Sequence, residues 1–148
     1  MVGYLRIVAG WLLLFSTFGS TALAADVGSV KNCHGQAVIL RGAERLPAEP
    51  GNRLMVMDTL QTGKDGAMGI ILRDDTVISM GPDSEMVLAE FLFHPKEQQM
   101  GILARFLRGT FTYLSGMIAK LDPDSVKLET PVGMVAVRGT HLLIKVDQ

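Results

Sequence analysis

The apolar residues of this chain come in short stretches, and this punctuation limits the folds that the chain can adopt. From residue 35 onward, Gly, Pro, Asn or Asp interrupts the apolar stretches about every 8 to 15 residues. A core-facing helix needs apolar residues at helical spacing over about 12 positions, and no stretch shows that period without an intervening Gly or Pro. The pattern therefore predicts an all-β chain of short strands.

Several of these stretches also alternate between apolar and polar residues. In one of them, Val126 and Leu128 share one face while Lys127 and Glu129 share the other, as in a strand with one wet face. Residues 103–107 have helical spacing as well, but this segment is short and ends at Gly109, so a strand is favoured there. The predicted strands cover residues 36–40, 67–72, 76–80, 85–93, 101–106, 110–114, 125–130, 132–137 and 140–146.

Three segments rich in Gly and Asp are predicted turns, at residues 62–66, 73–75 and 80–84. We expect these turns to join four strands into a meander. A sandwich and a twisted β-solenoid both fit strands of this length, and periodicity alone does not choose between them.

The first 24 residues have the layout of a secretory signal peptide. Arg6 precedes an apolar run over residues 7–18, which gives way to small residues ending in Ala24. This run of about 12 residues is shorter than the roughly 20 that a membrane-spanning helix needs. We expect cleavage after Ala24, which leaves residues 25–148 as one exported domain without a stable membrane span. An uncleaved N-terminal anchor is the alternative, and it also places the domain outside the cytoplasm.

Charge and cysteine content narrow the possible partners. The 14 basic and 15 acidic residues are scattered along the chain, so no basic field favours nucleic acid. Cys33 is the only cysteine, which excludes an internal disulfide. We expect its thiol to be buried, with intermolecular pairing as the alternative.

Residues that commonly carry metal or nucleophilic chemistry are dispersed. His34, His94 and His141 fall in separate segments without a metal-ligand spacing. Ser84 and Ser115 lie outside any Gly-x-Ser-x-Gly motif. The sequence therefore predicts no metal site, no cofactor and no enzymatic activity.

Three aspartates near the turns offer a possible calcium loop. Asp74, Asp75 and Asp83 lack the alternating ligand spacing of such loops, however. Ordinary turn chemistry, in which Asp bonds to nearby backbone, is the favoured interpretation.

Three blocks of residues resemble a known family in their order and spacing. Residues 50–66 hold an Asp that leads into Thr-Gly and a further Gly, and residues 72–84 hold an Asp-containing hairpin followed by Gly-Pro-Asp-Ser. Residues 107–140 hold Arg-Gly-Thr twice, with Thr-Pro between the two copies. Together the blocks resemble the FecR domain of periplasmic signalling proteins. The residues that carry the resemblance are Asp58, Thr62, Gly63, Gly66, Asp74, Pro82, Ser84, Gly109, Gly116, Thr130, Pro131, Arg138, Gly139 and Thr140.

Two positions depart from the family pattern, because Met57 and Asp75 stand where the family has Gly. The resemblance implies an all-β periplasmic domain of twisted β-solenoid or sandwich type. The best-known members relay a signal from an outer-membrane transporter to a cytoplasmic sigma factor. Because the flanking parts of that relay are not found here, we expect an extracytoplasmic module that acts by binding another envelope component.

The leading functional hypothesis is a non-catalytic module for protein interaction or envelope signalling, with an envelope protein as partner. The alternative is a carbohydrate or peptidoglycan-binding domain, which draws on Phe111 and Tyr113 as aromatic surface. For Arg138, binding to a partner's carboxylate competes with internal pairing to Glu129 or an Asp turn. Internal pairing is favoured, and it predicts that Arg138→Ala destabilises the fold more than it alters binding.

Overall fold

The computed structural model describes residues 25–139 and 141–147, so the predicted signal peptide and Thr140 lie outside the described residues. The all-β prediction is confirmed. Helical structure among the described residues is limited to one short α-helix, α1 (Met117–Leu121), and two 3-10 turns, η1 (Pro95–Glu97) and η2 (Pro123–Ser125). The strands are β1 (Gly28–His34), β2 (Ala37–Arg41), β3 (Glu44–Pro47), β4 (Arg53–Leu54), β5 (Thr59–Thr62), β6 (Ala67–Leu72), β7 (Val77–Met80), β8 (Glu85–His94), β9 (Gln99–Leu114), β10 (Val126–Thr130), β11 (Gly133–Ala136) and β12 (His141–Val146).

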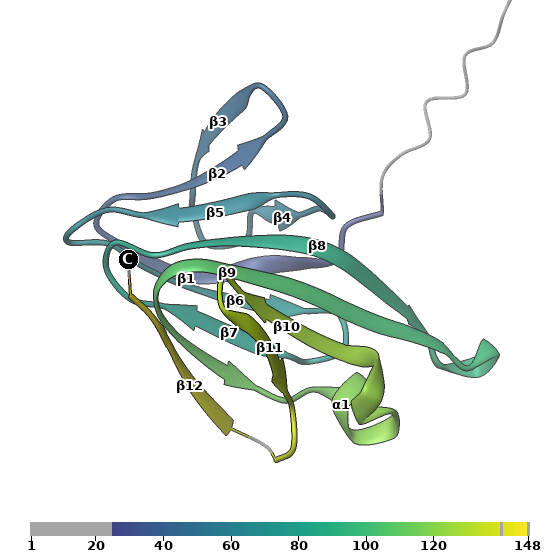
Figure 1. The fold of residues 1–148 in the computed structure, drawn as a ribbon. Coiled ribbons are helices and arrows are strands. Elements are labelled where there is room, and N and C mark those ends of the chain that lie inside the picture. Colours follow the sequence, from purple (N-terminus) through teal and green to yellow (C-terminus); the bar gives the residue numbers. More distant parts are fainter. Residues whose placement is uncertain (1–24, 140, 148) are drawn as a thin grey trace, which may run out of the picture.

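The strands form one continuous sheet that curls over itself into a half-barrel (Figure 1). Its main path runs β3-β2-β5-β8-β9-β7-β6-β1-β4, while β10 and β12 also pair with β9, and β11 pairs with β10. Most pairs are antiparallel, and β9 with β10 is parallel. One curled sheet therefore supplies both walls of the core, which in a sandwich come from two separate sheets.

The strand β9 connects the two halves of this sheet. Its first part pairs with β8 and β10, and its last part pairs with β7 and β12. The prediction of two separate strands, 101–106 and 110–114, is therefore wrong. The chain bends without leaving the sheet at Gly109, whose φ of 101° lies in the region that favours glycine.

The predicted four-strand meander is also wrong. The turn at 73–75 joins β6 to β7 in a hairpin as expected. The turns at 62–66 and 80–84 instead cross between the halves, since β5 pairs with β2 and β8 whereas β6 pairs with β1 and β7. Local turn chemistry marks where the chain reverses, but it does not determine which strand comes to lie alongside.

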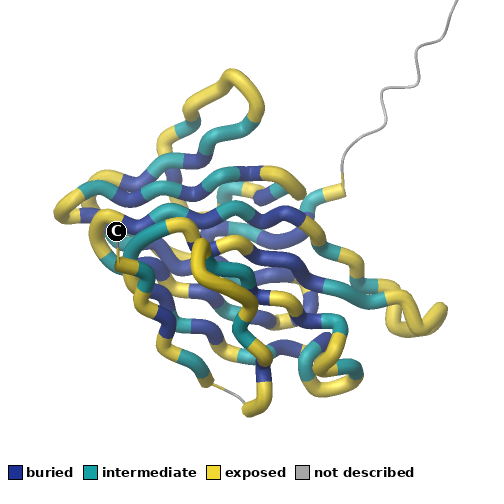
Figure 2. The backbone as a smooth tube through the Cα atoms, viewed as in Figure 1, coloured by how far each residue is buried: buried dark blue, intermediate teal, exposed yellow. Residues whose placement is uncertain are grey.

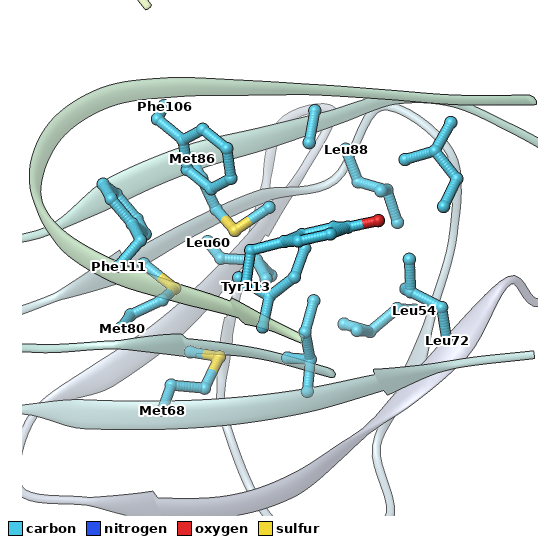
Figure 3. Close-up of a cluster of buried hydrophobic side chains, with 14 of the residues drawn as sticks. Leu54, Leu60, Met68, Leu72, Met80, Met86, Leu88, Phe106, Phe111 and Tyr113 are labelled. Carbon is cyan, nitrogen blue, oxygen red and sulfur yellow. The ribbon is translucent and has the colours of Figure 1, made fainter. Parts of the chain in front are cut away.

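The core lies between the two halves, where the inward residues of the alternating strands meet (Figure 2). Val126 and Leu128 are buried and Lys127 is exposed, as their alternation predicts. Figure 3 shows Met80 of β7 and Met86 of β8 beside the aromatic rings of β9, with Met68 of β6 next to Met80. The rings of Phe106 and Phe111 lie 4.6 Å apart, a tilted contact worth about 1 kcal/mol beyond the burial itself.

One polar group lies among these apolar side chains. Tyr113 is fully buried, and its hydroxyl has no partner in hydrogen-bond geometry among the described residues. Burial raises the pKa of Tyr113, and the nearby side chains of Thr76 and Ser115 offset this only in part.

Replacing Tyr113 by Phe tests the cost of that hydroxyl. At pH 7 we expect the free energy of unfolding to stay equal or rise by about 1 kcal/mol, because an unpaired buried hydroxyl is removed. Above about pH 10 the unfolded tyrosine loses its proton while the folded one keeps it, so the parent protein loses stability that Tyr113→Phe retains. Urea unfolding at pH 7 and pH 11 measures both, and a clear loss at pH 7 would show that the hydroxyl has a partner.

Candidate functional site

The first signature residue, Asp58, holds an ion pair at the start of β5. Its carboxylate is 1% exposed and accepts bonds from Arg41 Nε at 2.9 Å and Nη2 at 2.7 Å. The Met55 backbone N–H donates to the same carboxylate at 2.8 Å. The hydrogen bond to Asp58 raises the pKa of Arg41, which keeps the guanidinium charged. Asp58 thus joins the end of β2 to the turn before β5.

A second group of signature residues fastens the bend of β9. Thr62 Oγ1 donates to Gly81 O at 2.7 Å and accepts from the Ser84 N–H at 3.0 Å. Ser84 Oγ in turn accepts from the Thr110 N–H at 3.1 Å. A Cβ at Gly109 would lie 2.1 Å from Ser84 Oγ, so only glycine fits there. The end of β5, the start of β8 and the bend of β9 are tied together.

A third group links the β6–β7 hairpin to α1. Asp74 is fully buried, and its carboxylate accepts from Thr76 Oγ1 at 2.8 Å and from the Ile118 N–H at 3.2 Å. A Cβ at Gly116 would lie 2.3 Å from Asp74 O. Asp74 therefore serves the turn and the helix start.

The remaining signature residues of the first two blocks have no joint solvent-facing arrangement. Gly63 and Gly66 lie where the 62–66 turn crosses Gln36, and a Cβ at Gly66 would lie 2.1 Å from Gln36 O. Pro82 is exposed in the turn at 80–84. The three groups of contacts are thus separate parts of one scaffold.

Of the C-terminal signature residues, Thr130, Pro131, Arg138 and Gly139 lie on or just after the β10–β11 hairpin. Thr130 Oγ1 donates to Gly133 O at 2.9 Å across the tip that contains Pro131, and Gly139 O accepts from Ser115 Oγ at 2.9 Å. The tip, residues 131–134, is exposed throughout (Figure 2). Sequence reasoning did not identify its apolar residues, Val132 and Met134, which are 97% and 61% exposed.

The favoured internal pairing of Arg138, with Glu129 or an Asp turn, is wrong. Glu129 Oε2 accepts from Arg105 Nε at 2.7 Å, because parallel pairing of β9 with β10 places these residues opposite each other. Arg138 is exposed and forms no ion pair among the described residues. It lines a depression of about 330 Å³ together with Lys127 and Met134.

The candidates for metal or redox chemistry remain dispersed in space. Cys33 is half-buried rather than buried, and its Sγ donates to Ala48 O at 3.1 Å. His34 and His94 end β1 and β8, while His141 begins β12. Within the described ranges, no three His, Cys, Asp or Glu side chains are grouped so as to hold a metal ion.

The two positions that depart from the family pattern keep the backbone that glycine would adopt. Met57 has a φ of 71° and Asp75 a φ of 66°. Left-handed backbone costs an ordinary side chain about 1–2 kcal/mol, and Asp tolerates it better than Met. Both turns therefore keep a left-handed backbone without glycine.

The fold and its polar network define a class of protein. It is a β-rich half-barrel module whose signature residues mainly hold the fold together through internal contacts. A family model described as FecR protein matches residues 58–148, well over half of the chain. The chain therefore belongs to the FecR family. Neither a search of curated proteins nor a search of solved structures returned a match.

Two substitutions compare a scaffold residue with an exposed one. Asp58→Ala should destabilise the protein by about 3 kcal/mol, because it leaves Arg41 without its carboxylate and the Met55 N–H unpaired. Arg138→Ala should change stability by less than about 0.5 kcal/mol, since the side chain is exposed. Chemical denaturation of both variants measures the difference, and a large loss in Arg138→Ala would restore the structural role.

Replacing Met57 by Gly should stabilise the turn before β5. The side chain is 62% exposed, so little packing is lost, while the left-handed strain is removed. We expect a gain of about 0.5–1 kcal/mol in urea unfolding. Val56→Gly is the matched control and should lose stability, because the residue has no left-handed backbone to relieve. Equal effects in the two variants would contradict the interpretation.

Proposed function

We propose that this FecR-family chain is a non-catalytic module of the bacterial envelope that binds another protein, in the periplasm and as part of envelope signalling. The observation that carries the proposal is the contrast between the buried signature residues and the exposed C-terminal hairpin. Asp58, Thr62, Asp74 and Ser84 use their polar atoms inside the fold. The C-terminal hairpin, by contrast, presents apolar side chains to solvent.

The hairpin tip has the character of an interaction surface. Exposed apolar side chains that lie close together mark interaction sites more often than single ones do. Val132 and Met134 lie there, and the exposed Arg138 follows on the same hairpin. Met134 lines the same depression as Arg138, and an apolar side chain near an exposed guanidinium is typical of surfaces that bind proteins.

The periplasmic location rests on the signal-like pattern of residues 1–24. Among residues 25–139 and 141–147, the structure contains no helix of the length and apolarity needed to cross a bilayer. The non-catalytic assignment draws on the same internal bonds, because the buried Asp58, Asp74 and Ser84 side chains are engaged with neighbouring groups.

The carbohydrate-binding alternative loses the surface on which it depended. Phe111 and Tyr113 are both fully buried in the core. The only tryptophan of the chain, Trp11, falls within the predicted signal peptide. Sugar platforms need exposed flat rings, so protein binding is the better-supported function.

Site-specific cross-linking in the producing cells tests the proposal. A photoreactive amino acid at Val132 should yield a discrete protein adduct that mass spectrometry identifies. The same group at Lys31, exposed on β1 in the other half of the sheet, is the control and should give none. No adduct from Val132, or identical adducts from both positions, would contradict the proposal.

A further inference from the structure

The strand β11 is an open edge of the sheet. Within the described chain it pairs with β10 and with no other strand, so alternate backbone N–H and C=O groups face away from the sheet. Proteins usually protect such an edge with charged residues, proline or a covering element. The four residues of β11, Gly-Met-Val-Ala, carry no charge.

Two surface depressions near this edge have room for side chains of a partner. The depression of about 330 Å³ is lined by the whole of residues 134–138 and by the start of β10. A neighbouring depression of about 340 Å³ shares Asp124 and Lys127 with it and extends to Leu92 on β8. The first depression offers room for side chains of a strand added to β11, and the second continues it past the start of β10.

The charge beside the edge favours an anion. Lys127 and Arg138 both line the depression and both are exposed, against one carboxylate, Asp124. Neither cation forms an ion pair within the described residues, whereas Arg41 and Arg105 each bind a carboxylate. A carboxylate on an incoming chain would meet two cations there.

We propose that β11 accepts an extended strand of a partner protein, added to the sheet edge, with an acidic side chain of that strand binding Arg138 and Lys127. The inference rests on the proposed function and specifies its partner: an acidic peptide segment in β conformation. Backbone hydrogen bonds to β11 supply the pairing, and the charge supplies the selectivity.

A second copy of this chain fits the edge less well. It would bring another Lys127 and Arg138 rather than the missing anion. A four-residue edge also buries too little surface to hold a stable dimer, which needs about 1,200 Å² in total.

Peptide binding to protein purified from the envelope of producing cells tests the inference. The probe is a dye-labelled peptide, Thr-Val-Glu-Val-Thr-Val-Glu, and its counterpart has Lys in place of both Glu. Fluorescence anisotropy should show at least about tenfold tighter binding of the acidic peptide. Arg138→Glu should abolish or reverse this preference, and bound peptide should slow amide exchange in β11.

Two further variants distinguish binding at the β11 edge from non-specific binding to exposed apolar side chains. The double variant Val132→Ser with Met134→Ser should weaken acidic-peptide binding at least about tenfold. Leu143→Ser is the matched control, since this residue is 72% exposed on β12, which pairs with β9, and it should bind like the parent. All substituted residues are exposed, so unchanged urea midpoints check that folding is intact.

Several results would overturn the inference. The first two are equal affinity for both peptides and no saturable binding of the acidic peptide up to about 1 mM. The other two are slowed amide exchange outside β11 instead of in it, and a dimer of this chain that the double variant abolishes. A cellular adduct at Val132 combined with a failed peptide test would keep the proposed function and reject this surface. Peptide binding without any cellular adduct would keep this surface and reject the proposed function.

Discussion

The bend of β9 at Gly109 is the feature on which the rest of the fold depends. Because the strand turns without leaving the sheet, one segment of chain pairs with four others and holds both walls of the core. The bend needs a residue without a side chain, since Ser84 occupies the space where a Cβ would be. Ser84 then accepts a backbone bond beyond the bend and donates its own N–H to Thr62.

The polar signature residues of this chain therefore mark the places where separate segments are bonded to one another. Asp58, the Thr62–Ser84 pair and Asp74 each join two segments that are separated in the chain, and all are buried. Buried polar groups need partners, so each such joint restricts the chain to the arrangement in which its bonds are made. The family likeness over residues 58–148 accordingly informs the fold more than any chemistry.

The residues suited to binding are exposed, and the fold depends on them least. Val132 at the hairpin tip is almost fully exposed, and β11 behind it pairs only with β10 in the part of the chain that the structure describes. The arginines show the same contrast. Arg41 and Arg105 each form an ion pair with a carboxylate, while Arg138 is exposed to solvent. Scaffold and proposed interface are thus separate, so the interface can vary without loss of the fold.

Local pattern alone determined the all-β class, most strand positions and the buried faces, because alternation along a strand depends on near neighbours, as at Val126 and Leu128. The family assignment also followed from residue order. Only the tertiary structure decided that β9 is continuous, that β5 and β6 lie in different halves, and that Glu129 pairs with Arg105 rather than Arg138. These outcomes depend on strands far apart in the chain meeting across a shared core, and no local pattern records which strands will meet.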